Sequence, residues 1–290
     1  MTIVATRLAV IGVGLIGGSL ARAVRDAGLA GEVVGWSRRP ESRRIAIDQG
    51  LVDRVADMPE DAAEGADLVV VAARLSACAG LAARVSKTAA VGAVLTDVGS
   101  VKARQLAALE AAWPAPSLVV GAHPVAGSER SGAAAADPEL FRRSHCVLTP
   151  SPHTNPEALA RVRALWRGVG ATVDEMSPEQ HDAVLARVSH APHVLAYALV
   201  RAVQRARVAE DVLGYAGAGF RDTTRIAASS PALWREIVLE NAEAVLEALG
   251  EFDVEVRALR DAIENRDGET LEHLASLAAT HRSRLDEEPE

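Results

Sequence analysis

The first 175 residues alternate short apolar runs with longer segments of mixed polarity. The runs are rich in valine, leucine and alanine, and they cover residues 8–11, 33–36, 67–72, 93–97, 118–121, 146–149 and 171–174. Such runs, with amphipathic segments between them, are typical of strands buried on both faces of a parallel sheet. After Met176-Ser177-Pro178 the pattern becomes helix after helix. We therefore predict an α/β fold, with a doubly wound parallel sheet over residues 1–175 and an all-helical domain over residues 176–290.

The first apolar run leads directly into a glycine-rich segment, and helical spacing follows it. In this segment Gly12 permits a tight turn, Gly14 lets the backbone approach a pyrophosphate, and Gly17 lets the helix pack closely on the strand. The free N–H groups and the positive dipole of that helix start bind a diphosphate. The alternative is a glycine-rich turn that binds nothing. A strand–glycine loop–helix unit at this place predicts a Rossmann-type domain, with cofactor contacts at Gly12, Gly14, Leu15, Ile16 and Gly17.

The second apolar run ends in Ser37-Arg38-Arg39, about 20 residues beyond the glycines. An NAD enzyme usually carries Asp or Glu here, for the ribose 2′-hydroxyl. A serine hydroxyl and guanidinium groups suit a 2′-phosphate instead. The alternative is a solvated loop with ordinary surface arginines. We therefore expect NADP as the preferred cofactor, with NAD as a possibility.

Two polar segments follow strands of the predicted sheet. The strand over 118–121 leads into a loop over 122–129, in which His123 precedes Pro124. Ligands of doubly wound sheets bind beyond the carboxyl ends of the strands, so His123 is a candidate general base. Ser100 follows the strand over 93–97 and is placed to cap a helix that begins near Val101. Capping alone would explain Ser100, so a structural and a functional role are equally consistent with its position.

The helical half begins with an N-cap at Ser177 and Pro178 at the first helical position. Polar residues then recur at helical spacing and predict a polar wall that faces a cleft, an ordinary solvated face being the alternative. His190 and His193 could bind zinc, but no third ligand is clearly placed, so we predict no metal site. The wall consists of His181, Asp182, Ser189, His190 and His193.

Apolar positions between residues 236 and 264 recur at steps of three and four residues. They form more apolar helical surface than a thin single domain can bury, which favours a homodimer through these helices.

The composition of the chain restricts the kinds of partner that the protein can bind. The chain has 31 Lys and Arg against 39 Asp and Glu, a net charge of −8, which disfavours nucleic acid. Cys78 and Cys146 are single thiols without the spacing of a zinc site or a disulfide framework. No run approaches the roughly 18 apolar residues that span a bilayer. We expect no membrane partner and a cytoplasmic protein.

Five motifs together resemble the prephenate/arogenate dehydrogenases of tyrosine biosynthesis over essentially the whole chain. They are GVGLIGGSLA at 12–21, DVGSVK at 97–102, HPVAGSERSG at 123–132, SHAPH at 189–193 and FRDTTRIAASSPALW at 220–234. The resemblance implies an N-terminal Rossmann domain and a helical dimerisation domain. It also implies an enzyme that oxidises a 4-hydroxycyclohexadienyl ring and releases its carboxylate as CO₂. Prephenate then gives 4-hydroxyphenylpyruvate, and arogenate gives tyrosine.

The resemblance also implies roles for single residues. His123 accepts the proton of the C4 hydroxyl while hydride leaves C4 for the nicotinamide, and Ser100 hydrogen-bonds near His123. Arg225 holds a substrate carboxylate, with Trp234 packed behind it. The loop over 37–39 resembles that of the NADP-using members. Further substrate contacts are implied for Ser128, Ser189, His190 and His193 in the pocket and for Glu129 and Asp182 at its mouth.

Several alternatives stay open at this point. Prephenate and arogenate differ in a keto against an amino group, and one acidic side chain such as Glu129 could decide between them; a dual-substrate enzyme is a third reading. A β-hydroxyacid dehydrogenase of the same design would need a lysine base on the first interdomain helix, and no lysine follows Lys102. A dinucleotide-binding protein without turnover is the remaining class. With no αβ regulatory domain before residue 290, we expect no tyrosine inhibition through such a domain.

Overall fold

The computed structural model describes residues 3–127, 130–206, 208 and 212–285. The chain forms two compact units, one over residues 1–241 and one over residues 242–290. The domain boundary predicted from the sequence lies at 175/176, whereas the two compact units meet at 241/242. The predicted boundary between a sheet domain and a helical domain stays a prediction.

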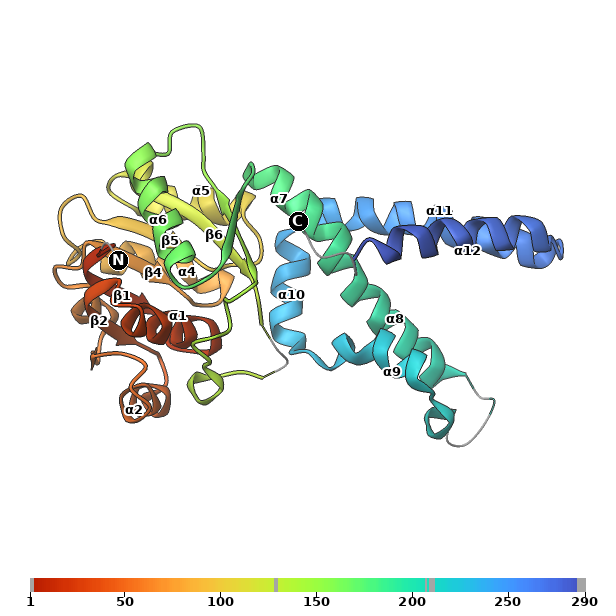
Figure 1. The fold of residues 1–290 in the computed structure, drawn as a ribbon, viewed down its shortest axis with the longest axis horizontal. Helices are drawn as coiled ribbons and strands as arrows, with labels where there is room; N and C mark the ends of the chain where they lie inside the picture. Colours follow the sequence, from red (N-terminus) through yellow and green to blue (C-terminus); the bar gives the residue numbers. More distant parts are fainter. Residues whose placement is uncertain (1–2, 128–129, 207, 209–211, 286–290) are drawn as a thin grey trace. The chain divides into compact units, whose positions relative to one another are not determined.

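The first unit is built on one eight-stranded sheet with the order β3-β2-β1-β4-β5-β6-β7-β8 (Figure 1). Its strands are β1 (Ala5–Ile11), β2 (Ala30–Trp36), β3 (Arg54–Val55), β4 (Leu68–Val71), β5 (Val94–Asp97), β6 (Val119–Val125), β7 (His145–Thr149) and β8 (Thr172–Glu175). Neighbouring strands are parallel except β6 and β7, which are antiparallel. The predicted doubly wound sheet is therefore confirmed, but it is mixed at this one pair.

Helices cover both faces of the sheet, which is why the central strands are apolar on both sides. On one face α1 (Leu15–Asp26), α2 (Pro40–Asp48) and α6 (Pro156–Gly168) pack on one set of strand residues, and Trp166 and Phe141 meet edge to face with ring centroids 5.2 Å apart. On the other face α3 (Pro59–Ala63), α4 (Leu75–Val85) and α5 (Ala103–Ala112) pack on the alternate residues.

In the part of this unit that the structure describes, four α-helices follow the sheet: α7 (Pro178–Leu185), α8 (Ala191–Arg205), α9 (Ala218–Thr224) and α10 (Pro231–Glu240). The Ser177 side chain accepts a hydrogen bond from the backbone N–H of Gln180, so the predicted N-cap is confirmed. A π-helical turn over Ala186–His190 joins α7 to α8. Such turns are frequent at functional sites, and this one carries Ser189 and His190.

Two carboxylates from these helices bind helix N-termini of the sheet part. Glu236 on α10 accepts hydrogen bonds from the backbone N–H and the hydroxyl of Ser76 at the start of α4, at 3.4 and 3.1 Å. Asp182 on α7 accepts the backbone N–H groups of Lys102 and Ala103 at the start of α5. A negative charge is favourable at a helix N-terminus, so both contacts fix the helices against the sheet.

The second unit contains α11 (Ala242–Glu264) and α12 (Gly268–Ser283). Asp267 caps α12 by accepting the backbone N–H of Thr270. Large apolar side chains stay exposed on both helices, at Leu246, Phe252, Val254, Leu259, Ile263, Leu271 and Leu277.

Among the residues that the structure describes, one segment, Pro178–Arg205, is long and apolar enough by length and composition to cross a membrane, which the sequence analysis did not predict. This segment also carries His181 and Asp182, whose side chains are buried against the sheet part. Core helices of soluble proteins pass the same test of length and composition, so the finding is weak support for a membrane span.

Candidate active site

A cavity of about 720 Å³ lies between the sheet and the helices of the first unit, within the range of small-molecule sites. Residues from both parts line it, and they include Ser100, His123, Ser189, His190, His193, Arg225 and Trp234. The imidazole of His123 and the guanidinium of Arg225, 102 positions apart in the chain, thus share one cavity.

His123 lies within β6, and the prediction that a loop carries it is wrong. Antiparallel pairing with β7, in which His123 stands opposite Val147, extends the strand to Val125. The side chain is 8 % exposed. Burial, reinforced by the neighbouring His181, holds the pKa of His123 well below its usual value of 6.5. His123 is therefore neutral near pH 7, the form that accepts a proton.

Ser100 does not cap α5, contrary to one of the two roles that its position suggested. The helix begins at Ala103, and the Asp182 carboxylate binds its first N–H groups. Ser100 is half-buried and lines the cavity together with His123. Of the two roles considered for Ser100, a role in the site is the one consistent with its position, and it stays a prediction.

A buried ion pair fixes the strand end beneath His123. Lys102 Nζ lies 2.6 Å from an oxygen of Asp97, and both side chains are 1 % exposed. Lys102 also donates to the carbonyl of Ala122 at 2.8 Å, and the Ala122 N–H donates to Asp97 at 3.1 Å. The ion pair thus binds both the backbone carbonyl and the backbone N–H of Ala122, the residue before His123. Sequence reasoning missed this role, although DVGSVK places the two charges at the end of a buried strand.

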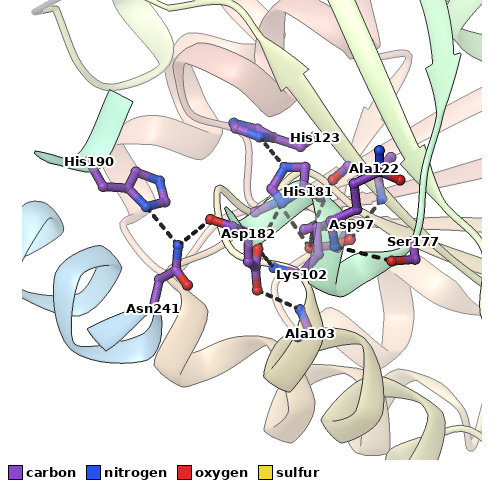
Figure 2. A network of polar contacts seen from close by, with 12 residues as sticks. Asp97, Lys102, Ala103, Ala122, His123, Ser177, His181, Asp182, His190 and Asn241 are labelled. Carbon is purple, nitrogen blue, oxygen red and sulfur yellow. Dashed lines mark hydrogen bonds and ion pairs between the residues drawn. The ribbon is translucent and has the colours of Figure 1, made fainter. Parts of the chain in front are cut away.

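Asp182 is 6 % exposed and does not lie at the mouth of the cavity, so its predicted position is wrong. Its carboxylate binds the start of α5 and also His181 Nδ1, at 2.8 Å. His181 is fully buried, and its Nε2 lies 2.8 Å from His123 Nδ1 (Figure 2). The sequence placed His181 in a polar wall but did not predict its contact with His123.

On the helical side of the cavity, His193 stacks on Trp234 with ring centroids 3.3 Å apart, and His190 meets Trp234 edge on. Trp234 therefore packs against these histidines, and its implied packing behind Arg225 stays a prediction. Ser189 accepts a hydrogen bond from His193 Nδ1 at its carbonyl. Burial, with a smaller contribution from the Arg225 charge, lowers the pKa of His193. Arg225 is exposed and begins a 3₁₀ turn over Arg225–Ala228.

The glycine loop between β1 and α1 fits a dinucleotide. A Cβ on Gly12 would lie 2.1 Å from the Ala72 carbonyl oxygen, and one on Gly17 would lie 2.1 Å from the Gly12 oxygen, so neither position tolerates a side chain. At Gly14, by contrast, no described atom lies within 4 Å of such a Cβ. Gly14 is the N-cap of α1 and offers no side-chain cap, which leaves the N–H groups at Leu15 and Ile16 open to a phosphate.

The segment over 37–39 follows β2, with Ser37 half-buried and Arg38 and Arg39 exposed. Within the described residues neither guanidinium forms a hydrogen bond or ion pair, which leaves both available to an anion. Arg43 on α2 donates to the Ser37 carbonyl at 2.8 Å and supports the segment.

Two predicted contacts, Ser128 and Glu129, lie outside the residues that the structure describes. Among the described residues no group of three or more His, Cys, Asp or Glu could hold a metal ion.

Comparison with known proteins decides the family. Residues 20–175 match the model "prephenate dehydrogenase, nucleotide-binding domain", and residues 177–277 match "prephenate dehydrogenase, dimerization domain". The chain belongs to the prephenate dehydrogenase family. It is accordingly a dehydrogenase whose N-terminal part binds a nicotinamide dinucleotide.

Individual relatives span nearly the whole chain. A cyclohexadienyl dehydrogenase of Zymomonas mobilis is 38% identical over 92% of both chains. The crystal structure of a prephenate dehydrogenase from Aquifex aeolicus, with hydroxyphenyl propionate and NAD⁺, superposes with a TM-score of 0.91 at 34% identity over 97% of this chain and 98% of that one. A Synechocystis arogenate dehydrogenase superposes with a TM-score of 0.84 at 27% identity over 96% of this chain and 99% of that one.

Proposed function

We propose that the protein catalyses the oxidative decarboxylation of prephenate to 4-hydroxyphenylpyruvate, with NADP⁺ as the preferred hydride acceptor. The observation that carries the proposal is one cavity that combines a neutral buried imidazole, His123, with an exposed guanidinium, Arg225. Prephenate offers a ring hydroxyl to the first and a carboxylate to the second. Family membership supports the same reaction.

Each side chain of the cavity has a separate role in the proposed reaction. His123 takes the proton of the C4 hydroxyl through Nε2, since its Nδ1 faces His181. Ser100, which lines the same cavity, hydrogen-bonds the same hydroxyl. Arg225 pairs with a carboxylate and orients the ring, while Ser189, His190 and His193 bound the far side. A nicotinamide, when bound, supplies the acceptor for the hydride that leaves C4. The ring carboxylate departs as CO₂, its bonding pair completes the aromatic ring, and the C4 oxygen, now a phenolate, takes the proton back from His123 to give the phenol.

Arogenate is the second candidate, because a Synechocystis arogenate dehydrogenase is similar over 96% of the chain. Prephenate and arogenate share the ring, its carboxylate and the C4 hydroxyl, so His123 and Arg225 serve both. A two-by-two assay of prephenate and arogenate against NAD⁺ and NADP⁺, followed at 340 nm, tests the proposal. We expect the highest kcat/KM for prephenate with NADP⁺, and absence of turnover in all four combinations would refute an enzymatic function.

The preference for NADP⁺ is proposed from Ser37, Arg38 and Arg39, whose exposed guanidinium groups suit a 2′-phosphate. Arg38→Ala removes one charged partner of that phosphate. A hydrogen bond to a charged group contributes about 1.5–3 kcal/mol, so NADP⁺ affinity should fall roughly 10- to 100-fold while NAD⁺ affinity changes little. Fluorescence titration with each dinucleotide measures the two Kd values. Arg44→Ala on α2, which removes another exposed arginine, is the matched control. Equal losses for both dinucleotides would refute the assignment.

We further propose a homodimer through α11 and α12. The matched dimerization-domain model covers residues 177–277, and exposed apolar residues such as Phe252 and Leu259 lie on α11. Burying them against a second copy would release water from apolar surface. Light scattering at micromolar concentration should give the mass of a dimer, and a monomer would contradict the proposal.

A further inference from the structure

Asp182 is the fixed point of a hydrogen-bond network that reaches two histidines of the cavity, one through its carboxylate and one through its backbone carbonyl. Its Oδ1 accepts the Lys102 N–H at 2.8 Å, and its Oδ2 accepts the Ala103 N–H at 2.9 Å (Figure 2). Backbone N–H groups can only donate, so both carboxylate oxygens act as acceptors. The N-terminus of α5 favours the anion at this place.

The first branch of the network runs from Asp182 through His181 to His123. His181 Nδ1 lies 2.8 Å from Asp182 Oδ1, so Nδ1 carries the ring proton. Burial lowers the pKa of His181, and the neutral ring then leaves Nε2 bare. His123 Nδ1 lies 2.8 Å from that bare nitrogen and must donate to it. The proton of neutral His123 is therefore on Nδ1, and its Nε2 is a free acceptor.

The second branch runs from the backbone of Asp182 through Asn241 to His190. The Asn241 side-chain nitrogen lies 2.8 Å from the Asp182 carbonyl oxygen, which only accepts, so the orientation of the amide is determined. The same nitrogen lies 3.0 Å from His190 Nδ1 and directs its second hydrogen there. His190 Nδ1 is therefore bare, and Nε2 carries the proton.

His190 Nε2 is buried and has no hydrogen-bond partner among the described residues, and His190 lines the cavity. The side chain is 1 % exposed, and burial lowers its pKa to about 4. A neutral buried N–H without a partner is costly unless a ligand satisfies it, so this group is available to an oxygen atom of the substrate.

We propose that Asp182 sets opposite tautomers in the two histidines, leaving His123 with a bare Nε2 that accepts a proton and His190 with an Nε2–H that donates a hydrogen bond. His181 and Asn241 are the positioning residues through which Asp182 acts. The inference rests on the proposed function only in that His123 is the base. When His123 takes the hydroxyl proton, its Nδ1–H bond to His181, backed by the Asp182 carboxylate, stabilises the imidazolium that forms. The His190 N–H meanwhile holds a carboxylate or keto oxygen without adding a charge.

Long-range ¹H–¹⁵N correlation spectra of the 290-residue chain, with ¹⁵N-labelled histidine at neutral pH, test the tautomers directly. A protonated and a bare ring nitrogen have distinct ¹⁵N shifts, and His123→Asn and His190→Asn assign the two rings by removing one set of signals each. We expect Nδ1–H on His123 and Nε2–H on His190. The same tautomer on both rings, or the reverse assignment, would overturn the proposal. This spectrum needs no turnover, so it decides the proposal even if prephenate proves not to be the substrate.

Variants test the consequence for the reaction. Asp182→Asn replaces one of the two acceptor oxygens by an NH₂ group. Where that group takes the place of Oδ1 it donates to His181 Nδ1, which reverses the first branch and puts the proton on His123 Nε2, while the Lys102 N–H loses its acceptor. A base held in the wrong tautomer loses about 10⁴-fold in kcat, and we expect a loss of that order with KM and NADP⁺ affinity little changed. Glu179→Gln, an exposed carboxylate on the same helix, is the control and should leave kcat unchanged.

His181→Gln and His181→Ala separate positioning from packing. The Gln carbonyl oxygen can still accept from His123 Nδ1, so its kcat should exceed that of the Ala variant by about 10-fold or more, the value of one recovered hydrogen bond. Equal rates for the two variants, or an Asp182→Asn protein whose His123 tautomer and kcat match the wild type, would refute the role of the network. If these variants fail to fold, the wild-type spectrum still decides.

Discussion

His123→Asn should lower kcat for prephenate oxidation by about 10²- to 10⁴-fold, the usual contribution of a positioned general base. Asparagine keeps a polar side chain of similar reach in the buried strand, but its amide has no basic nitrogen to take the hydroxyl proton. Because Arg225 still binds a carboxylate, KM should change little. Steady-state kinetics at saturating NADP⁺ measures both constants. Undiminished kcat would remove His123 from the mechanism.

The acid limb of the pH profile gives an independent check on the same residue. Only neutral His123 accepts a proton, and burial lowers its pKa well below 6.5. As pH falls, the base is therefore retained through pH 6.5 and is lost only in more acidic solution. We expect kcat/KM, which reports the free enzyme, to stay near its maximum at that pH. A half-maximal value at or above pH 6.5 would show that His123 is not held neutral by its environment or is not the essential base.

Arg225→Ala should weaken prephenate binding severely. Removing one partner of a charged pair costs about 2–5 kcal/mol, partly because the other charge is left without a partner, so KM should rise by at least about 30-fold. The loss should be confined to the substrate, because the dinucleotide loop between β1 and α1 is not altered. Steady-state kinetics with prephenate and with NADP⁺ as the varied substrate gives the two KM values. Titration with NADP⁺ shows whether dinucleotide affinity is unchanged.

Arg235→Ala is the matched control for Arg225→Ala, since Arg235 is also an exposed arginine and lies next to Trp234 on α10. Its removal lowers the net charge by the same amount and should leave KM unchanged. If both variants raised KM equally, the effect would come from the overall electrostatic field of the protein and not from a specific contact between Arg225 and the substrate carboxylate.

Much of the fold could be predicted because its signals are local. Helix α6 (Pro156–Gly168) begins where local signals place a helix start, since Asn155 caps it and proline occupies its first position. The apolar runs became strands because each is short, bounded by turn residues and covered on both faces. One error of secondary structure, the loop around His123, arose because antiparallel pairing with β7 extends β6 beyond its apolar run.

The candidate site was predicted less completely. The motifs and the family resemblance predicted that His123, Ser100 and Arg225 belong to the site. In the structure all three line one cavity. The resemblance implied that Asp182 lies at the mouth of the cavity. Its carboxylate instead caps a helix whose first residues stand 80 positions earlier in the chain. No helical or strand periodicity reports a partner at that distance.

By itself the sequence determined the alternation of strands and helices, the glycine loop that approaches a diphosphate, and the identity of the side chains available for chemistry. Only the tertiary structure decided which of them act on each other: His181 meets His123 across 58 positions, and Asn241 meets His190 across 51. The physical reason is that propensity and periodicity depend on neighbours within a few residues. A tautomer or a lowered pKa depends instead on the groups that packing brings within about 3 Å, whatever their distance along the chain.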